Sequence, residues 1–179
     1  AVAAHAFVTS LLVTLAVPSE SVHDIAFFRS AGGFRGHKRL LYEGGVRTPF
    51  IVRWPGHIPA GTKNDTTVFS AVDLLPTLCA AAGIQPGNTH PLDGRNMWPA
   101  LTNNEVIPPK PLFWAAKRNE TQDRQHGLLS GQWKLVENIT DDRKVTHELY
   151  NLTEDPAEKN NKAAANPRSE EHTSELQSR

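Results

Sequence analysis

The alternation of apolar and polar positions becomes regular after Gly36, and it first predicts a strand. The run Val46–Gly56, which reads VRTPFIVRWPG, is apolar and rich in β-branched residues. A run of this kind that ends in Pro-Gly is typical of a buried strand closed by a turn. Pro49 has no N–H for a ladder hydrogen bond, so it should lie at the start of the strand or at a sheet edge.

Helical spacing follows over residues 66–83. Pro76 favours a helix that begins near Asp73–Leu74, because proline is tolerated in a first turn, and Gly83 is expected to end the helix as its C-cap. Cys79 lies within this helix, and we interpret it as a small buried hydrophobe, because the sequence shows no environment that would activate a nucleophile. The apolar residues that should share one buried face are Val68, Val72, Leu75, Leu78 and Ala82.

The last third of the chain is typical of short strands separated by polar turns. The segment 153–161, TEDPAEKNN, is expected to be a turn that leads into a short helix. The order of strand, helix and then clustered strands predicts the tail of an α/β layer followed by a small antiparallel sheet. The three strand candidates are PLFWAAK (111–117), HGLLSGQWKLVEN (126–138) and HELYNL (147–152).

The two ends of the chain stand apart from this pattern. An apolar run over residues 6–17 is too short to span a bilayer, and we interpret it as a buried strand or helix rather than a signal peptide, because no basic segment precedes it. The stretch 168–178, RSEEHTSELQS, resembles the translation of a common sequencing adapter. The chain therefore divides into four parts. Residues 1–29 are either a non-native or a divergent stretch, and residues 30–105 form the end of an α/β catalytic domain. Residues 106–167 form a small C-terminal subdomain, and residues 168–179 are the adapter-like tail.

Composition limits the functional classes. Lys plus Arg balance Asp plus Glu at 19 each, so no overall field favours nucleic acid or an anionic membrane, and any anion site must be local. One cysteine permits neither an internal disulfide nor a Cys-rich zinc site. The histidines show no metal-ligand spacing, and we interpret four of them as surface residues: His57, His90, His126 and His147.

Four Asn-x-Ser/Thr sequons favour passage through the secretory pathway, to a lysosomal or extracellular destination. Such triplets also arise by chance, so unmodified asparagines in a cytosolic or bacterial protein are the alternative. The candidate glycosylation sites are Asn64, Asn119, Asn138 and Asn151.

Candidate chemistry is concentrated around Lys38. The stretch Arg35–Arg39, RGHKR, carries four basic side chains just before Glu43-Gly44-Gly45. Glycines allow a backbone to approach a ligand closely, and a lysine ammonium held by such a loop is a suitable point-charge partner for sulfate or phosphate. By residue type alone, a solvated basic surface is the commoner alternative. Glu43 and Arg47 are four residues apart and opposite in charge, which predicts a structural pair that fixes the loop.

The stretch 32–61, GGFRGHKRLLYEGGVRTPFIVRWPGHIPAG, resembles the distal part of the formylglycine-dependent sulfatases of the arylsulfatase and N-acetylgalactosamine-6-sulfatase type. The specific arrangement is Lys-x-x-x-Tyr-Glu-Gly-Gly-x-Arg-x-Pro, from Lys38 to Pro49. Later segments follow in the family's order, so the resemblance covers about residues 30–167. These segments are SAVDLLPTLCAAAGI, LDGRNMWPAL, GQWKLVEN and ELYNLTEDPAEKNN.

The resemblance implies an α/β fold similar to that of alkaline phosphatase, with a small C-terminal antiparallel sheet and one helix. It also implies hydrolysis of a sulfate ester, in which the hydrate of a formylglycine attacks sulfur beside a calcium ion and nearby cations stabilise charge on the transferring group. In that scheme the lysine that matches Lys38 contacts the sulfate oxygens. The expected substrate is a sulfated small molecule or a sulfated glycan.

The chain departs from the family pattern in its catalytic parts. No Cys-x-Pro-x-Arg occurs, Cys79 is followed by Ala-Ala-Ala-Gly, and Asp24 is followed by Ile25 where the family has an Asp-Asn pair. We therefore assign no catalytic and no metal-binding residue in this chain, expect the calcium ligands upstream, and expect the chain to be inactive alone. A phosphodiesterase or phosphonate hydrolase of the same superfamily, and a non-catalytic sulfatase-like protein, are the alternatives.

Overall fold

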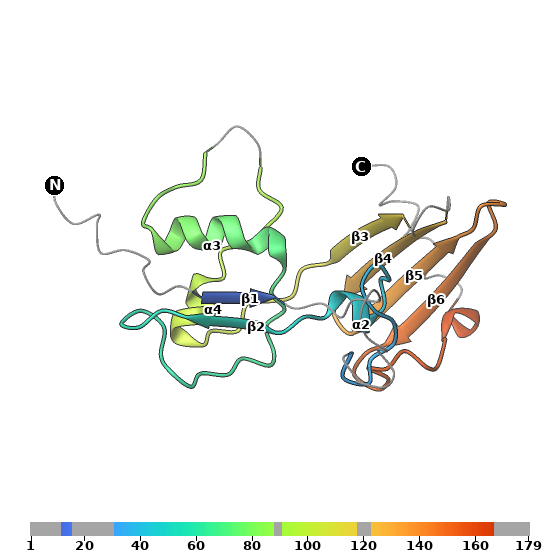
Figure 1. The fold of residues 1–179 in the computed structure, drawn as a ribbon, viewed down its shortest axis with the longest axis horizontal. Helices are drawn as coiled ribbons and strands as arrows, with labels where there is room; N and C mark the ends of the chain where they lie inside the picture. Colours follow the sequence, from blue (N-terminus) through green and yellow to red (C-terminus); the bar gives the residue numbers. More distant parts are fainter. Residues whose placement is uncertain (1–11, 16–30, 88–90, 118–122, 167–179) are drawn as a thin grey trace. The chain divides into compact units, whose positions relative to one another are not determined.

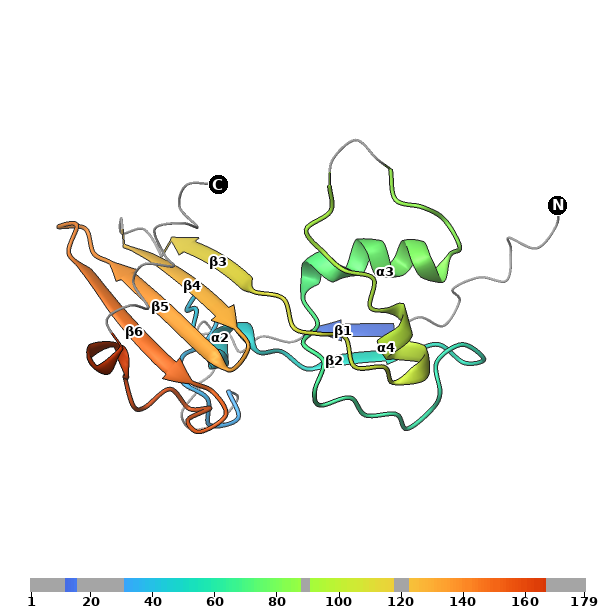
Figure 2. The same cartoon turned by 180° about the vertical axis from the view of Figure 1, so that it is seen from behind.

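The computed structural model forms two compact units, which Figures 1 and 2 show from opposite sides. One unit is built from residues 50–109 and most of an N-terminal strand, and the other contains residues 31–49 and 110–166. Within the described part of the chain, no helix is both long and apolar enough to cross a membrane. The structure describes residues 12–15, 31–87, 91–117 and 123–166.

The first unit combines a two-stranded sheet with two helices. Strand β1 (Leu12–Leu15) pairs with β2 (Phe50–Arg53), so the apolar run at the start of the chain contains a strand, one of its two expected forms. A 3₁₀ turn, η1 (Ala71–Asp73), leads into helix α3 (Leu74–Ala81), and α4 (Trp98–Asn103) follows. The remainder of residues 1–29, and the adapter-like tail, lie outside the described residues.

Strand β2 is shorter than the predicted strand Val46–Gly56. Val46 instead ends a helical turn, α2 (Glu43–Val46), so the predicted start of the strand is wrong. Pro49 directly precedes the strand, as predicted, because it cannot donate a ladder hydrogen bond. Gly56 has a φ of +81° in the turn after the strand, so the predicted Pro-Gly turn is confirmed.

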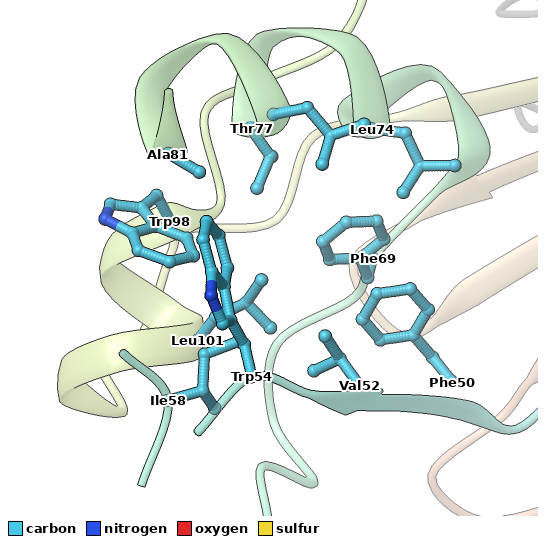
Figure 3. A pocket seen from close by; sticks show the side chains of 11 residues that line it. Phe50, Val52, Trp54, Ile58, Phe69, Leu74, Thr77, Ala81, Trp98 and Leu101 are labelled. Atoms are coloured by element: carbon cyan, nitrogen blue, oxygen red, sulfur yellow. The ribbon is translucent and has the colours of Figure 1, made fainter. Parts of the chain in front are cut away.

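The core of the first unit lies between β2 and the two helices. Figure 3 shows side chains of β2, α3 and α4 turned towards one another around a cavity of about 20 Å³. That volume holds about one water molecule, so the cavity is a small packing gap and not a substrate site. Its lining residues include Phe50, Val52, Leu74, Thr77, Trp98 and Leu101.

Helix α3 begins and ends where the sequence predicts. Gly83 has a φ of +68° and donates its N–H to the Ala80 carbonyl, which closes the last turn. Cys79 is buried, as predicted. The predicted buried face is wrong, because Leu75 is 55% exposed and the other four apolar residues are exposed too: Val68, Val72, Leu78 and Ala82.

Polar contacts at Asp73 and Thr77 decide which face of α3 is buried. The Thr77 hydroxyl donates to the Asp73 carbonyl at 2.6 Å and accepts the Met97 N–H at 2.9 Å. The buried Asp73 carboxylate accepts the N–H groups of Ser70 at 2.9 Å and of Arg95 at 2.7 Å. These bonds attach the chain around Arg95 and Met97 to the side of the helix that carries Thr77, and the side that carries Leu75 stays exposed.

The second unit contains the small antiparallel sheet that the sequence predicts. Its strand order is β3-β4-β5-β6, and every neighbouring pair is antiparallel. The short helix expected after TEDPAEKNN is a single 3₁₀ turn, η2 (Ala163–Ala165). The strands are β3 (Leu112–Lys117), β4 (Arg124–Ser130), β5 (Trp133–Ile139) and β6 (Val145–Asn151).

The strand candidate HGLLSGQWKLVEN is two strands joined by a hairpin, so its prediction as one strand is wrong. Ser130 pairs with Trp133 across the turn, and Gly131 between them has a φ of +58°. Only glycine adopts this conformation without strain, and Ser130-Gly131 therefore marks the turn.

Residues 31–49 belong to the same compact unit as the C-terminal sheet, whereas the division at residue 30 groups them with the α/β part. The core of this unit is formed by Tyr42 from the loop, Val136 from β5 and Tyr150 from β6. Side chains alternate between the two faces of a strand, so the sheet face that carries Val136 also carries Lys134 and the residue paired with it, Tyr150. This face of the sheet supports the loop that contains Lys38.

Candidate functional site

Lys38 lies on a tight turn of the second unit, and its side chain is exposed. The turn is closed by the Leu40 N–H, which donates to the His37 carbonyl at 3.0 Å. Arg39 has a φ of +79°, a conformation that is uncommon for residues other than glycine. The backbone next to Lys38 is therefore held in one particular shape by its surroundings.

The diglycine lies directly against this turn. A Cβ on Gly45 would lie 2.0 Å from the Leu40 oxygen and 2.4 Å from the His37 oxygen, and a Cβ on Gly44 would lie 2.4 Å from the Gly36 oxygen. The sequence predicts that the backbone of the diglycine lies close to a ligand. In the structure it lies close to the backbone of the Lys38 loop instead. The glycines are needed because backbone packs on backbone.

We expect Gly45→Ala to lower the free energy of unfolding of the second unit by about 1–3 kcal/mol, because the added Cβ must displace the backbone of the Lys38 turn. Chemical denaturation measures the loss. Gly87→Ala is the matched control, since a Cβ there meets no atom within 4 Å. Equal stability of the two variants would contradict the packing described here.

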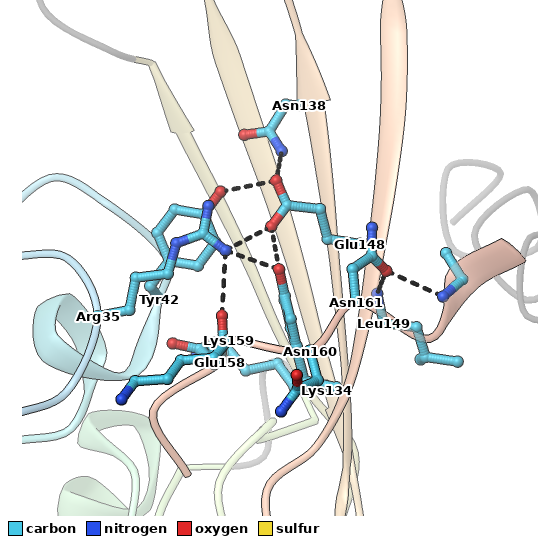
Figure 4. Close-up of polar contacts among 12 residues, drawn as sticks. Arg35, Tyr42, Lys134, Asn138, Glu148, Leu149, Glu158, Lys159, Asn160 and Asn161 are labelled. Carbon is cyan, nitrogen blue, oxygen red and sulfur yellow. Dashed lines mark hydrogen bonds and ion pairs between the residues drawn. The ribbon is translucent and has the colours of Figure 1, made fainter. Parts of the chain in front are cut away.

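Arg35 fastens the loop to the sheet, as Figure 4 shows. Its Nη1 donates to Glu148 Oε2 at 2.8 Å and to the Tyr150 hydroxyl at 2.6 Å. Its guanidinium carbon lies 3.8 Å from the centre of the Tyr42 ring. Glu148 also accepts hydrogen bonds from the Tyr42 hydroxyl at 3.0 Å and from Asn138 Nδ2 at 3.1 Å. The Glu148 carboxylate on β6 thus contacts Arg35 and Tyr42 of the loop, Asn138 of β5, and the hydroxyl of Tyr150 on its own strand.

The shifted pKa values of Arg35, Tyr42 and Tyr150 keep all three side chains protonated. Burial, and then the Glu148 carboxylate, raise the pKa of the Tyr42 and Tyr150 hydroxyls, although Arg35 acts in the opposite direction. Burial lowers the pKa of Arg35, but Tyr42, Glu148 and Tyr150 outweigh it, so the net direction is upward. The hydroxyls therefore remain donors and the guanidinium remains charged.

Glu43, in the Tyr-Glu-Gly-Gly segment, is held by two buried charged residues, one on β5 and one in the turn after β6. Its Oε1 accepts a hydrogen bond from Lys134 Nζ at 2.7 Å, and the same ammonium lies 3.2 Å from Glu158 Oε1. Glu158 Oε2 in turn accepts the backbone N–H of Glu43 at 2.7 Å. The predicted pair of Glu43 with Arg47 is confirmed, with Nε 3.6 Å from Oε2, but the Arg47 side chain is 56% exposed and contributes little.

Sequence reasoning missed Lys134 and Glu158. Lys134 stands between Trp133 and Leu135 in an apolar strand candidate, and a lysine that is fully buried there requires a carboxylate partner. That signal was available, but the identity of the partner was not, because Glu43 and Lys134 are 91 residues apart.

An open hollow of about 510 Å³ lies beside Arg35 and the side chains that it contacts. It is lined by Gly33, Arg35, Ala157, Glu158 and Lys159. Lys38 is not among these lining residues, so contact between Lys38 and a ligand stays a prediction.

The opposite face of the sheet carries a row of three titratable residues, one from each of three neighbouring strands. His126 Nδ1 lies 2.8 Å from Glu137 Oε1, and His147 Nε2 lies 3.0 Å from Glu137 Oε2. The two histidines are thus mostly covered side chains and not the surface residues that the sequence predicts. Burial acts to raise the pKa of Glu137, but the hydrogen bonds from His126 and His147 outweigh it and hold the pKa below its usual value.

This shift has a direction that can be measured. A carboxyl whose pKa is lower in the folded than in the unfolded state contributes stability above its unfolded pKa, and the contribution is lost as pH falls through the folded value. We expect the free energy of unfolding of this unit to fall as the pH drops below about 4.5, the usual pKa range of a glutamate. Glu137→Gln should flatten that slope in pH-dependent denaturation, whereas Glu105→Gln, an exposed carboxylate of the other unit, should not. An unchanged slope in Glu137→Gln would contradict the conclusion that the histidine hydrogen bonds lower the pKa of Glu137.

The candidate glycosylation sites differ in their surroundings. Asn64 lies in a loop, partly exposed, and its Oδ1 accepts the N–H groups of Thr66 and Thr67. Asn138 hydrogen-bonds Gln125 and Glu148 within the sheet, and Asn151 is only 5% exposed. Asn119 lies outside the described residues. Use of any of these sequons stays a prediction, and the surroundings favour Asn64.

Among residues 31–87, 91–117 and 123–166 no cluster of three or more His, Cys, Asp or Glu side chains could hold an ion. A calcium site therefore stays a prediction.

Comparison with known proteins identifies the class. Residues 33–179 match the protein-family model "N-sulphoglucosamine sulphohydrolase, C-terminal". Arylsulfatase A of Bos taurus is 33% identical over 149 residues, which cover 73% of this chain and 29% of that protein. A sulfatase of Formosa agariphila is 31% identical over 163 residues, covering 80% and 29%. N-acetylgalactosamine-6-sulfatase of Sus scrofa is 36% identical over 85 residues, covering 48% and 16%.

Solved structures agree in fold. A protein from a study of glycosaminoglycan metabolism by Bacteroides thetaiotaomicron superposes with a TM-score of 0.65 at 29% identity, over 87% of this chain and 34% of that one. A protein solved with its substrate D-glucosamine-2-N,6-O-disulfate gives a TM-score of 0.62 at 24% identity, over 79% and 29%, a likeness of fold alone.

The fold is therefore the distal part of a sulfatase fold, with its small C-terminal antiparallel sheet, as the resemblance implies. The chain belongs to the sulfatase family, as a member of the group defined by the C-terminal region of N-sulphoglucosamine sulphohydrolase. It spans less than a third of the length of the curated relatives described above.

Proposed function

We propose that this chain is the distal part of a sulfuric ester hydrolase, and that Lys38 contacts the sulfate group of its substrate. The observation that carries the proposal is the placement of Lys38 in a sulfatase-family chain. Its exposed side chain extends from a turn that is packed on Gly45 and fastened to the sheet through Arg35 and Glu43. The substrate class is a sulfated small molecule or a sulfated glycan.

The physical role of Lys38 follows from the rigidity of its support. An ammonium is a compact charge with three donors, well suited to the oxygens of a sulfate. A cation fixed in advance stabilises charge that develops on the transferring group without a cost of reorganisation. The packed turn supplies this fixed backbone, while the side chain adapts to the ligand.

The remaining chemistry is proposed to come from outside this chain. Formylglycine would supply the nucleophile and calcium would supply additional positive charge. The described residues contain no cluster that fits a metal, and Cys79 is buried and followed by Ala-Ala-Ala-Gly. We assign no step through either group to these residues, and we expect the chain alone to be inactive.

The test is turnover of a chromogenic aryl sulfate by the full-length protein. Release of the phenol and of inorganic sulfate supports the proposal. Turnover of an aryl phosphodiester with no turnover of the sulfate would assign the protein to phosphoryl transfer. No turnover of either ester, with an intact formylglycine motif and calcium present, would favour a non-catalytic sulfatase-like protein.

We also propose a secretory-pathway location, on the basis of the four sequons. Expression of the full-length protein in a eukaryotic secretory host should yield a product whose mass falls on treatment with an N-glycosidase. Asn64→Gln should remove part of that difference, because Asn64 lies in a loop. A product of unmodified mass would exclude use of the sequons.

A further inference from the structure

Three sequence segments that are far apart meet at one buried cluster of charges. Glu43 belongs to the Tyr-Glu-Gly-Gly segment, Lys134 to GQWKLVEN on β5, and Glu158 to the turn TEDPAEKNN after β6. The Lys134 and Glu158 side chains are both fully buried, and the Glu43 side chain is 8% exposed. Figure 4 shows Lys134 and Glu158 close to the Arg35 group on the same side of the sheet.

The cluster fixes the backbone as well as side chains. Glu158 uses one oxygen for the Glu43 N–H, at 2.7 Å, and the other faces Lys134 at 3.2 Å. The position of Glu158 is fixed in turn by its own N–H, which donates to the Asp155 carbonyl at 3.1 Å. The first residue of α2 is therefore held from both its backbone and its carboxylate.

The constraint continues from Glu43 to the turn that carries Lys38. Gly44, next to Glu43, donates its N–H to the Arg35 carbonyl at 2.7 Å. Gly45 packs on the Leu40 oxygen, within the turn. Leu41 donates its N–H to Gln125 Oε1 at 2.7 Å, which adds a direct bond from the turn to β4. A displacement at Glu43 thus moves the backbone on which Lys38 stands.

Stability alone does not account for such a cluster. A buried ion pair contributes little compared with apolar residues that fill the same volume, because its charges lose their hydration. It does impose direction and distance on the groups that it joins, since each partner is satisfied in only one arrangement.

We propose that Lys134 and Glu158 are positioning residues for Lys38. Through Glu43 they set where the Lys38 turn lies relative to the C-terminal sheet, so a sulfatase of this group needs its C-terminal subdomain to place the cation that meets the sulfate. The inference rests on the proposed role of Lys38 in binding sulfate.

The test compares Glu158→Gln with Leu135→Ala in the full-length protein. The glutamine keeps an oxygen for the Glu43 N–H but turns an NH₂ group towards the Lys134 ammonium, so it disturbs the cluster with little change in volume. Leu135 is buried on the opposite face of the sheet and is next to Lys134 in sequence, so its replacement weakens the same sheet without altering the charges. Both variants are assayed at a temperature where both are folded.

We expect Glu158→Gln to lower kcat/KM for an aryl sulfate by about 10-fold to 10²-fold, as a displaced catalytic group does, and Leu135→Ala to leave it close to that of the parent. In hydrogen exchange, Glu158→Gln should increase exchange at the Leu40 and Gly44 amides relative to the Val136 amide of β5. Leu135→Ala weakens β5 itself, so it should not increase that ratio.

Equal kcat/KM in the two variants, or an unchanged exchange ratio in Glu158→Gln, would overturn the positioning role. If the parent does not hydrolyse sulfate esters, the proposed function fails, and hydrogen exchange still decides whether the cluster positions the turn. Lys134→Met gives a second variant with the opposite change in charge, and the same selective increase at Leu40 and Gly44 is expected.

Discussion

Lys38→Ala in the full-length protein is expected to raise the barrier to sulfate-ester hydrolysis by about 3–4 kcal/mol, which is a loss of 10²-fold to 10³-fold in kcat/KM. The loss arises because one fixed charge that faces the transferring group is removed. Folding should be nearly unaffected, since the side chain is exposed and its truncation leaves the backbone of the turn in place. Steady-state kinetics with an aryl sulfate, together with a thermal melt, measure the two effects separately.

Lys63→Ala is the matched control for this experiment. Lys63 is an exposed lysine of the other unit, 2.7 Å from Asp65, and its loss should leave kcat/KM unchanged. Kinetics of Lys38→Ala that match those of Lys63→Ala would show that Lys38 is a surface cation, and the proposed sulfate contact would have to be abandoned.

Lys134→Met is expected to lower the free energy of unfolding of the second unit by about 3–5 kcal/mol. The substitution leaves the Glu43 and Glu158 carboxylates buried without their shared cation, and Arg47, which also pairs with Glu43, lies mostly in solvent. Chemical denaturation of the chain measures the loss. Lys144→Met, an exposed lysine of the same unit, should cost far less.

The loss should also depend on pH in a definite direction. Burial raises the pKa of Glu158, and the Lys134 ammonium opposes that rise. A carboxyl with a raised folded-state pKa stabilises the fold at low pH, and this contribution disappears as pH rises through the folded value. Removal of Lys134 should therefore cost less at pH 4 than at pH 7.

Lys134→Met combined with Glu158→Gln should lose less stability than Lys134→Met alone, because one uncompensated charge is removed. A loss below about 1 kcal/mol at neutral pH would show that the cluster is not buried as described.

Local features of this protein were predictable from its sequence. The start of α3 follows from Pro76, its end from Gly83, and the place of β2 after Pro49, because each depends on the backbone of one or two residues. The pair of Glu43 with Arg47 follows from a spacing of one helical turn. The order of the segments from Lys38 onwards indicated the sulfatase family, which the comparisons confirm.

The buried face of α3 was not predictable in this way. Helical spacing placed Leu75 and Leu78 inside, and both are exposed. The hydrogen bonds of Asp73 and Thr77 with the chain around Arg95 and Met97 decide the orientation. Those bonds join positions about 20 residues apart. The spacing of apolar residues within one helix carries no information about such distant partners.

The sequence by itself determined the bounds of α3, the family and the candidate lysine, because each is encoded in short stretches. Tertiary structure alone decided what holds that lysine in place. Arg35 meets Glu148 across 113 residues, and Glu43 meets Glu158 across 115. Charges so far apart become neighbours only when the sheet folds and buries them, and burial then makes each partner necessary to the other.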